Sequence, residues 1–310
     1  MTQVILNGLF IGSFYALIAL GYSMVYGIIK LLNFAHGDVF MFGAFIGMTL
    51  LTAIPGIGGL GIGALFIALV LAALATGCLG MLIEALAYRP LRTAPRLSVL
   101  ITAVGMSFFL EYGVRQFWGP DPQPWPMSGR LTNQEAWPVS LNQITERIQI
   151  FDAELNGSQI LLMVIAVALM AVLALYIGKT REGRAMRAIA LDQRAATLMG
   201  VNVNGTISRV FFIGSALAGV AGVMHGAYYS SIDFMMGFLL GLKAFTAAVI
   251  GGIGNLYGAM LGGLTLGLLE AIGSKYLGTE WKDVFAFGFL ILFLTLRPTG
   301  ILGERVTERM

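Results

Sequence analysis

The chain has 310 residues, of which 57% are hydrophobic and 11% are charged, and its formal net charge is +3. This composition excludes a soluble globular protein. Apolar stretches near the length that crosses a bilayer, about 20 residues, recur from one end of the chain to the other, so we expect an all-α, polytopic membrane helical bundle. Lys and Arg lie between these stretches, as membrane topology requires, and the net charge therefore does not indicate nucleic-acid binding.

Nine apolar segments are candidate transmembrane helices of a single domain, residues 1–310. They cover residues 4–29, 36–54, 61–87, 97–117, 159–178, 207–225, 237–253, 257–273 and 284–296. The second and seventh are interrupted by glycine or charge, so broken or re-entrant helices and a total of eight spans are the alternative. Nine crossings place most of the 19 Lys and Arg residues on one side, which predicts an external N-terminus and a cytoplasmic C-terminus. Eight crossings would move the N-terminus inside.

One long segment between the apolar stretches, residues 119–157, is different in kind. It opens with GPDPQPWP, whose prolines exclude a helix, and continues with a stretch in which Val, Leu and Ile partly alternate as in a small hairpin. The distribution of charge places this segment outside. We predict an external cap that is too small to have a core of its own and that serves as a docking surface.

Two short motifs recur in the same order along the chain. FIGS at residues 10–13 returns at residues 212–215, and LGMLIEA at residues 79–85 is echoed by LGLLEA at residues 266–271. If nine segments cross, the two members of each pair cross in opposite directions. That is the geometry of an inverted-topology repeat, which builds transport sites near the bilayer midplane. The repeat therefore indicates a transporter and not a membrane enzyme or a scaffold.

Sequence motifs give no support to a catalytic, nucleotide or metal site. GKT at residues 178–180 resembles the end of a phosphate-binding loop, but Leu173 occupies the position of the first glycine and a helix precedes the motif. His36 and His225 lack the spacing of metal ligands. We therefore expect no catalytic residue, no metal and no cofactor in this chain.

Ionisable and polar residues at membrane depth are candidates for a translocation path. A charge in hydrocarbon is costly, so such a group faces a cavity, a partner or another charge. Residues 33–38, NFAHGD, are the favoured candidates, because they also interrupt a helix where backbone groups could line a path. Glu84 lies near the inner end of its segment and could instead pair with Arg89. The candidate residues are Asn33, His36, Asp38, Glu84, Lys243 and Glu270.

The longest strongly charged run, residues 179–203, lies between two apolar segments. Good helix formers dominate it, and between Ala185 and Met199 the apolar residues fall near one helical face. We predict a short amphipathic helix in the connection between two transmembrane segments. A solvated loop helix that keeps positive charge inside is the alternative reading of the same pattern.

Three separated motifs resemble those of permease subunits of branched-chain amino-acid ABC importers. They are NGL at residues 7–9 together with NFAHGD at 33–38, GRAMRAIA at 183–190, and GLKAFTAAVIGGIGN at 241–255. The resemblance covers nearly the whole chain. It implies a multi-pass subunit of the bacterial inner membrane, with the cap at residues 119–157 in the periplasm. It also implies four kinds of partner: membrane lipid, a second permease of the same or another sequence, two cytoplasmic ABC ATPases that bind the ATP, and a periplasmic substrate-binding protein.

The same resemblance implies that residues 179–203 form the cytoplasmic coupling loop that contacts the ATPase. AATLMG at residues 195–200 fits the family's Ala-Ala-x-x-x-Gly core, although Arg194 stands where an acidic residue is often found. Small residues would allow the helix to sit in a groove, and flanking charges would fix its register. The implied coupling residues are Arg184, Arg187, Asp192, Ala195, Ala196 and Gly200.

The expected function is the ATP-driven import of branched-chain, hydrophobic amino acids. A urea or short-amide importer of the same family is an alternative, since its permeases share the opening motif. From another class, a channel or an ion-coupled carrier could use Asp38, Glu84 and Glu270 as a proton or cation route. Dependence of uptake on an ATPase or on an ion gradient distinguishes these classes.

Overall fold

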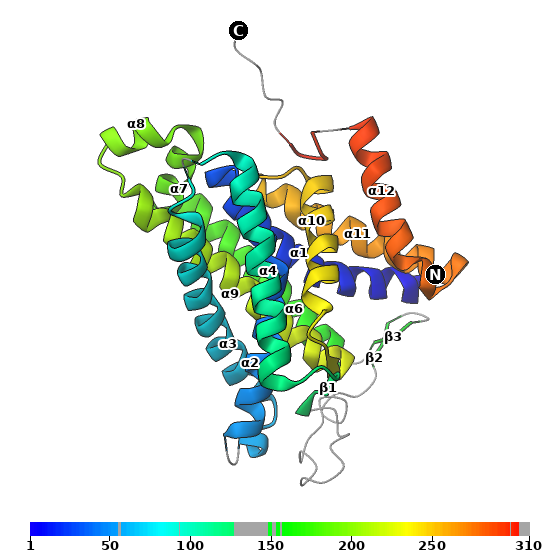
Figure 1. The fold of residues 1–310 in the computed structure, drawn as a ribbon. Helices are drawn as coiled ribbons and strands as arrows, with labels where there is room; N and C mark the ends of the chain where they lie inside the picture. The colour runs from blue at the N-terminus through cyan, green and yellow to red at the C-terminus, as the bar shows by residue number, and fades with distance from the viewer. Residues whose placement is uncertain are drawn as a thin grey trace.

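The computed structural model describes residues 1–54, 57–92, 94–126, 148–150, 153–155, 157–297 and 299–303. Its helical bundle is shown in Figure 1. All nine predicted apolar segments form helices. They are α1 (Thr2–Ile29), α2 (His36–Ala53), α3 (Ile62–Ile83), α4 (Arg96–Trp118), α6 (Gly157–Lys179), α9 (Val203–Tyr229), α10 (Met236–Gly251), α11 (Leu256–Leu277) and α12 (Lys282–Leu296).

Shorter elements connect these helices. The helical ones are η1 (Ile57–Leu60), the π-helical turn η2 (Glu84–Tyr88), α7 (Arg181–Leu191), α8 (Gln193–Leu198) and η4 (Thr279–Trp281). The strands are β1 (Gln123–Pro124), β2 (Ile148–Ile150), β3 (Ala153–Leu155) and β4 (Ser231–Ile232). In Figure 1, α7 and α8 lie at one end of the bundle and β1 lies at the other.

Seven helical segments in the described part of the chain are long and apolar enough to cross a membrane. α10, with 16 residues, is a shorter apolar helix, and α12 has 15 residues. The breaks predicted inside the second and seventh segments are absent, because α2 and α10 are each continuous. The breaks instead precede these helices. Lys30 and Ser230, the residues that directly follow α1 and α9, both have left-handed backbones, and in both cases the next helix begins six residues after them.

The helices that carry the recurring motifs pack in two pairs. α1 packs along α11, which contains LGLLEA, and α9 packs along α3, which together with the start of η2 contains LGMLIEA. Glycine allows both close approaches: a Cβ atom added to Gly12 would lie 2.8 Å from the Cα atom of Leu264, and one added to Gly80 would lie 2.8 Å from the carbonyl oxygen of Phe211. Opposite crossing of the two halves in a membrane stays a prediction.

The predicted cap is described only in part, because residues 127–147, 151–152 and 156 lie outside the described residues. Within it, β2 pairs with β3 in an antiparallel hairpin that sets Ile148 opposite Leu155. A short hairpin is therefore present at the end of this segment, whereas the alternating residues before position 148 lie outside the described residues. β1 pairs with β4, which joins this segment to the connection between α9 and α10.

Candidate translocation and coupling sites

The first turns of α2 and α10 meet inside the bundle. A Cβ atom added to Gly237 would lie 2.9 Å from the Cα atom of Asp38, so the two helix starts touch through backbone. Only glycine permits this approach. The contact brings NFAHGD at residues 33–38 next to α10, which carries part of the third sequence motif.

Buried hydroxyl groups surround this helix start. Asp38 is fully buried, and the Ser107 hydroxyl of α4 donates a hydrogen bond to its Oδ2 atom. The Tyr88 hydroxyl donates to Asn33 Oδ1 at 2.9 Å. The ring of Tyr22 meets the ring of His36 edge-on at 4.7 Å between centroids. The structure therefore gathers the three predicted residues with three hydroxyl side chains that sequence reasoning missed, because single hydroxyls in apolar helices are common.

Two polar atoms at this site are left without a partner. Asp38 Oδ1 and His36 Nε2 are buried and form no hydrogen bond within the described residues. A buried polar atom without a partner is costly, so its presence marks a place where a passing or bound polar group would be stabilised.

Lys243 and Glu270, predicted separately, are bonded to each other. Lys243 Nζ donates to Glu270 Oε1 at 2.8 Å and also lies 2.6 Å from Asp283 Oδ1. The Tyr15 hydroxyl donates to Glu270 Oε2 at 2.6 Å. These four side chains come from α10, α11, α12 and α1, so the cluster joins four helices. Tyr15 and Asp283 were missed because nothing in the sequence indicates which helices are neighbours.

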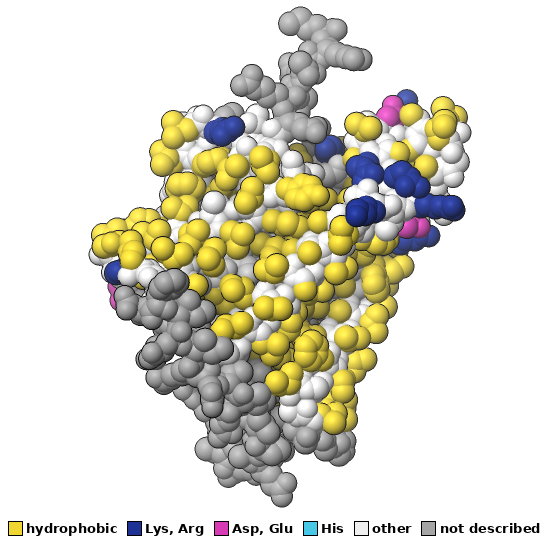
Figure 2. Space-filling view, turned by 180° about the vertical axis from the view of Figure 1, so that it is seen from behind, with side chains coloured by type: hydrophobic (Ala, Val, Ile, Leu, Met, Phe, Trp, Pro, Cys, Tyr) yellow, Lys and Arg dark blue, Asp and Glu magenta, His cyan; other side chains and the backbone are white. Residues whose placement is uncertain are grey.

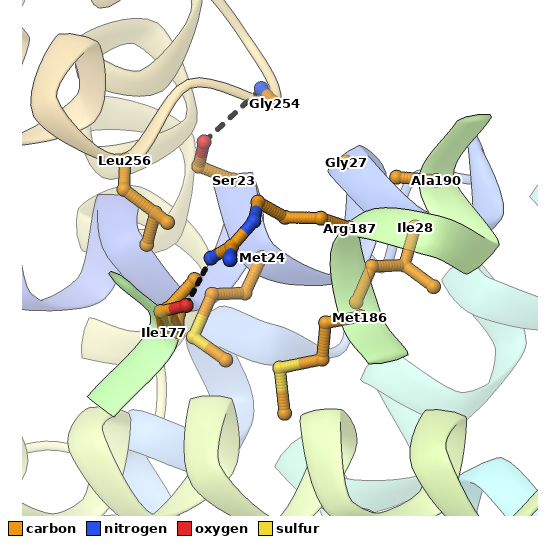
Figure 3. A pocket seen from close by; sticks show the side chains of 10 residues that line it. All are labelled: Ser23, Met24, Gly27, Ile28, Ile177, Met186, Arg187, Ala190, Gly254 and Leu256. Carbon is orange, nitrogen blue, oxygen red and sulfur yellow. Dashed lines mark hydrogen bonds between the residues drawn. The ribbon is translucent and has the colours of Figure 1, made fainter. Parts of the chain in front are cut away.

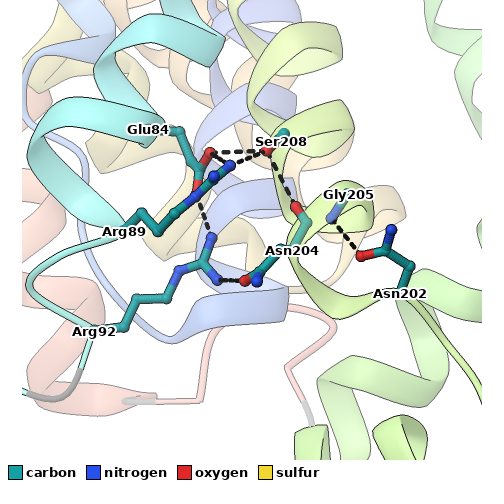
Figure 4. Close-up of polar contacts among 7 residues, drawn as sticks. All are labelled: Glu84, Arg89, Arg92, Asn202, Asn204, Gly205 and Ser208. Atoms are coloured by element: carbon teal, nitrogen blue, oxygen red, sulfur yellow. Dashed lines mark hydrogen bonds and ion pairs between the residues drawn. The ribbon is translucent and has the colours of Figure 1, made fainter.

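Glu84 is held by a clamp at the junction of η2 and α9 (Figure 4). Its carboxylate is fully buried and accepts hydrogen bonds from Arg89 at 2.9 Å and from Ser208 of α9 at 2.8 Å, and it also pairs with Arg92. The predicted pairing with Arg89 is confirmed, while Arg92 was missed. The bond to Glu84 raises the pKa of the Arg89 guanidinium. Arg92 donates at 2.6 Å to Asn204, which fastens the clamp to the start of α9.

The single amphipathic helix predicted between residues 185 and 199 is wrong, since the chain forms α7 and α8 with a break at Asp192. Asp192 Oδ1 accepts hydrogen bonds from the backbone N–H groups of Arg194, at 2.7 Å, and Ala195, at 3.1 Å, and so caps α8. The Asp192 carboxylate therefore starts a second helix. The apolar residues that were expected to share one helical face are divided between α7 and α8.

Arg187 is turned toward the protein body (Figure 3). Its guanidinium donates to the carbonyl oxygen of Ile177 at the end of α6 and crosses a cavity of about 80 Å³. Met24 of α1 and Met186 of α7 give this cavity apolar walls. Arg187 therefore fastens α7 to α6, although it is exposed, as Arg184 is.

The tip formed by α8 and the residues beside it carries exposed apolar side chains. Leu191, Leu198 and Met199 are 84–89% exposed. Ala195 is also exposed, but Ala196 is buried, so the two predicted alanines face opposite ways. Figure 2 shows Lys and Arg side chains gathered over this end of the molecule, above a largely hydrophobic body. A patch of apolar side chains rimmed by charge is typical of a site that docks another protein.

Gly200 ends this segment with φ of +83°, and a Cβ atom added there would meet no atom within 4 Å. A left-handed backbone favours glycine, so the residue is needed for conformation and not for space.

Comparisons with known proteins agree over nearly the whole chain. The family model described as branched-chain amino acid transport system / permease component matches residues 4–294. The high-affinity branched-chain amino acid transport system permease protein BraD of Pseudomonas aeruginosa is 44% identical over 99% of this chain and 97% of its own length. The corresponding permease protein LivH of Escherichia coli is 43% identical over the same shares.

A more distant relative, the autoinducer 2 import system permease protein LsrC of Enterobacter, is 28% identical over 56% of this chain and 50% of its own. No solved structure matches the chain.

Proposed function

Because the chain belongs to the permease family of branched-chain amino-acid transport systems, we propose that it is the membrane-spanning subunit of an ATP-driven importer of these amino acids. The observation that carries this proposal is the 44% identity to BraD, which extends over 99% of the chain. The protein is a multi-pass protein of the inner membrane. A second permease, two cytoplasmic ATPases and a periplasmic binding protein complete the proposed importer.

The α8 tip supports the proposed ATPase contact. Leu198 and Met199 are almost wholly exposed and lie on a basic, non-spanning loop, where lipid would not cover them. Apolar side chains in such a place are stabilised when another protein buries them. The coupling surface is therefore Ala195, Leu198 and Met199, while Asp192 and Arg187 hold the loop in shape.

A continuous set of contacts leads from this tip to the polar site. Residues 199–202 join α8 to α9, and the Asn202 side chain caps α9 by accepting from the Gly205 N–H at 3.0 Å. The Glu84 clamp binds the start of α9 to η2. Further along, α9 packs on α2, where a Cβ atom added to Gly222 would lie 2.9 Å from the Ala44 nitrogen. Movement of the tip is thus passed to α2, which carries Asp38.

An ion-coupled carrier is disfavoured by the ion pairs. Glu84, one of the three carboxylates that such a carrier would use as a cation route, is bonded to Arg89 and Arg92. A buried carboxylate that is already paired with two guanidinium groups offers little to a passing cation, since displacing a partner would leave a charge unpaired.

The experiment that tests the function is uptake in vesicles that contain the complete importer with its binding protein outside. We expect labelled leucine to accumulate with ATP inside and not without it, and urea to be excluded. Uptake of urea alone would support the short-amide alternative. Leucine uptake driven by an ion gradient without ATP would overturn the proposal.

A further inference from the structure

A second cavity lies where the first turns of α1 and α12 meet the end of α11. Its volume is about 230 Å³, several times the roughly 30 Å³ share of one water molecule, so a solute of amino-acid size fits. Its polar lining consists of Asn7, Glu270, Ser274, Lys275 and Lys282. None of these residues belongs to the polar site at Asp38 or to the α8 tip, and Glu270 is shared with the Lys243 cluster.

One part of the lining suits an ammonium group. Glu270 is only 3% exposed, and although it already bonds Lys243 and Tyr15, a carboxylate has about four lone-pair sites and can accept further donors. The hydroxyl group of Ser274 is buried and has no hydrogen-bond partner within the described residues. A hydroxyl in that state gains a bond when a ligand fills the cavity.

Another part of the lining suits a carboxylate. Lys275 and Lys282 form no ion pair with any acidic residue in the described ranges of the chain, unlike Lys243 in the neighbouring cluster. The remaining walls are the aliphatic side chains Val4 and Ile11 of α1 and Ala271 of α11. The cavity therefore combines a negative group, positive groups and an aliphatic wall.

We propose that this cavity is a binding site for a free aliphatic amino acid. The α-ammonium group of the ligand faces Glu270 and Ser274, its carboxylate faces Lys275 and Lys282, and its side chain lies on Val4 and Ile11. The proposal rests on the proposed function and identifies a place where the permease itself holds the substrate.

The position of the cavity fits a first site after release from a binding protein. β3, which belongs to the predicted external cap, contacts α1, and Figure 1 shows β2 and β3 beside the N-terminal end of this helix. A binding protein docked on the cap would release its ligand next to the cavity. Glu270 also connects the cavity to Lys243 of α10, so an ammonium group bound here competes for the carboxylate that links α10 to α11.

The test uses the complete importer and a photoactivatable, diazirine-bearing leucine analogue as the probe. We expect label on peptides that contain residues 4–11 and 270–282. Excess leucine should reduce this label about tenfold, whereas isoamylamine, which lacks the carboxylate, should compete about tenfold more weakly because it cannot pair with the lysines. Label confined to other peptides would overturn the proposal.

Variants give an independent readout. Lys282→Met and Ser274→Leu should each lower labelling and ATP-driven leucine uptake by about tenfold, since they remove a charge partner or fill the cavity. Lys30→Met, which neutralises a lysine beyond the other end of α1, should behave like the unchanged protein. Melting temperature and complex formation identify a variant that has failed to fold. If a variant has failed to fold, the peptides labelled in the unchanged importer are the test of the proposal.

The two proposals fail in different ways. If the unchanged importer does not accumulate leucine with ATP, the proposed function is wrong. If it does accumulate leucine while both cavity variants match Lys30→Met, the function stands and the cavity is not a substrate site.

Discussion

Gly37, in the first turn of α2, lies against Gly241 of α10 so closely that a Cβ atom added to Gly37 would be 2.7 Å from the Cα atom of Gly241. The neighbouring Asp38 is therefore placed by backbone contact between two short helices. Any change in the angle between α2 and α10 moves the start of α2 and the polar site with it.

Replacing Gly37 with alanine should disturb this contact. Because backbone atoms cannot move aside as a side chain can, we expect Gly37→Ala to lower the free energy of unfolding by about 1–3 kcal/mol and to reduce uptake. Gly105→Ala in α4 is the matched control: its added Cβ atom meets nothing within 4 Å, so it should be neutral or slightly stabilising. Thermal unfolding in detergent measures both. Equal melting temperatures would contradict the close contact.

Glu84→Gln should open the clamp at η2. Removal of the buried charge leaves the guanidinium groups of Arg89 and Arg92 without their common partner, and we expect it to lower the melting temperature more than the loss of any one neutral donor to this carboxylate. Ser208→Ala, which removes one neutral donor, should cost only about 1 kcal/mol. Thermal unfolding in detergent compares the two variants. Glu280→Gln, which removes a carboxylate at an exposed position, is the control. A Ser208 variant less stable than the Glu84 variant would be inconsistent with a clamp centred on the carboxylate.

Lys243→Met should destabilise the bundle by about 3 kcal/mol, because it leaves Glu270 buried without its cation. Tyr15→Phe, which removes the hydroxyl bonded to the same carboxylate, should cost about 1.5–3 kcal/mol. A double-mutant cycle should find the two changes non-additive. Tyr112→Phe, at an exposed position of α4, is the control for loss of a hydroxyl. Additive effects would mean that the two side chains act separately.

Leu198→Asp should prevent ATPases from binding to the permease. Placing a carboxylate at the centre of an apolar contact should cost about 2 kcal/mol or more of binding free energy, while the fold, in which Leu198 is exposed, should not change. Co-purification of the ATPases measures the loss. Gln193→Ser, on the same helix, should retain them. Normal co-purification of the Leu198 variant would exclude α8 as the docking surface.

Two substitutions at Gly200 distinguish the effect of backbone conformation from the effect of side-chain size. Gly200→Val should strain the left-handed backbone by about 1–2 kcal/mol and uncouple ATP hydrolysis from uptake. Gly200→Asn adds a side chain of similar size but tolerates this backbone, so it should retain coupling. The ratio of uptake to ATP hydrolysed in vesicles is the measurement. Equal loss in both variants would indicate that bulk, not conformation, matters.

Helix positions were the part of the fold most accessible from sequence. The ends of α6 and α11 fall within a few residues of the predicted segments, because length and apolarity alone specify a membrane-crossing helix. The break at Asp192 was missed, since the same apolar spacing fits one helix or two. The Asp192 side chain, in the middle of the charged run at residues 179–203, caps α8 and so divides the segment into two helices.

The candidate site was predictable residue by residue but not as a set of contacts. Glu84 and Arg89 lie on one local stretch of chain, so their pairing could be expected. Lys243 and Glu270 lie on different helices, and Ser107 reaches Asp38 across the bundle. Such pairs depend on how neighbouring helices are rotated about their axes, which periodicity of a single helix does not determine.

The bond between Tyr15 and Glu270 joins residues 255 positions apart. A ribosome adding about 5–20 residues per second needs roughly 10–50 s to make the intervening chain. Throughout that interval the first helix stands in the bilayer without the helix against which most of its length will rest. The packing of α1 is therefore completed only when synthesis of the chain is almost finished. Until then, lipid or an insertion factor must cover the surface of the newly synthesised first helix.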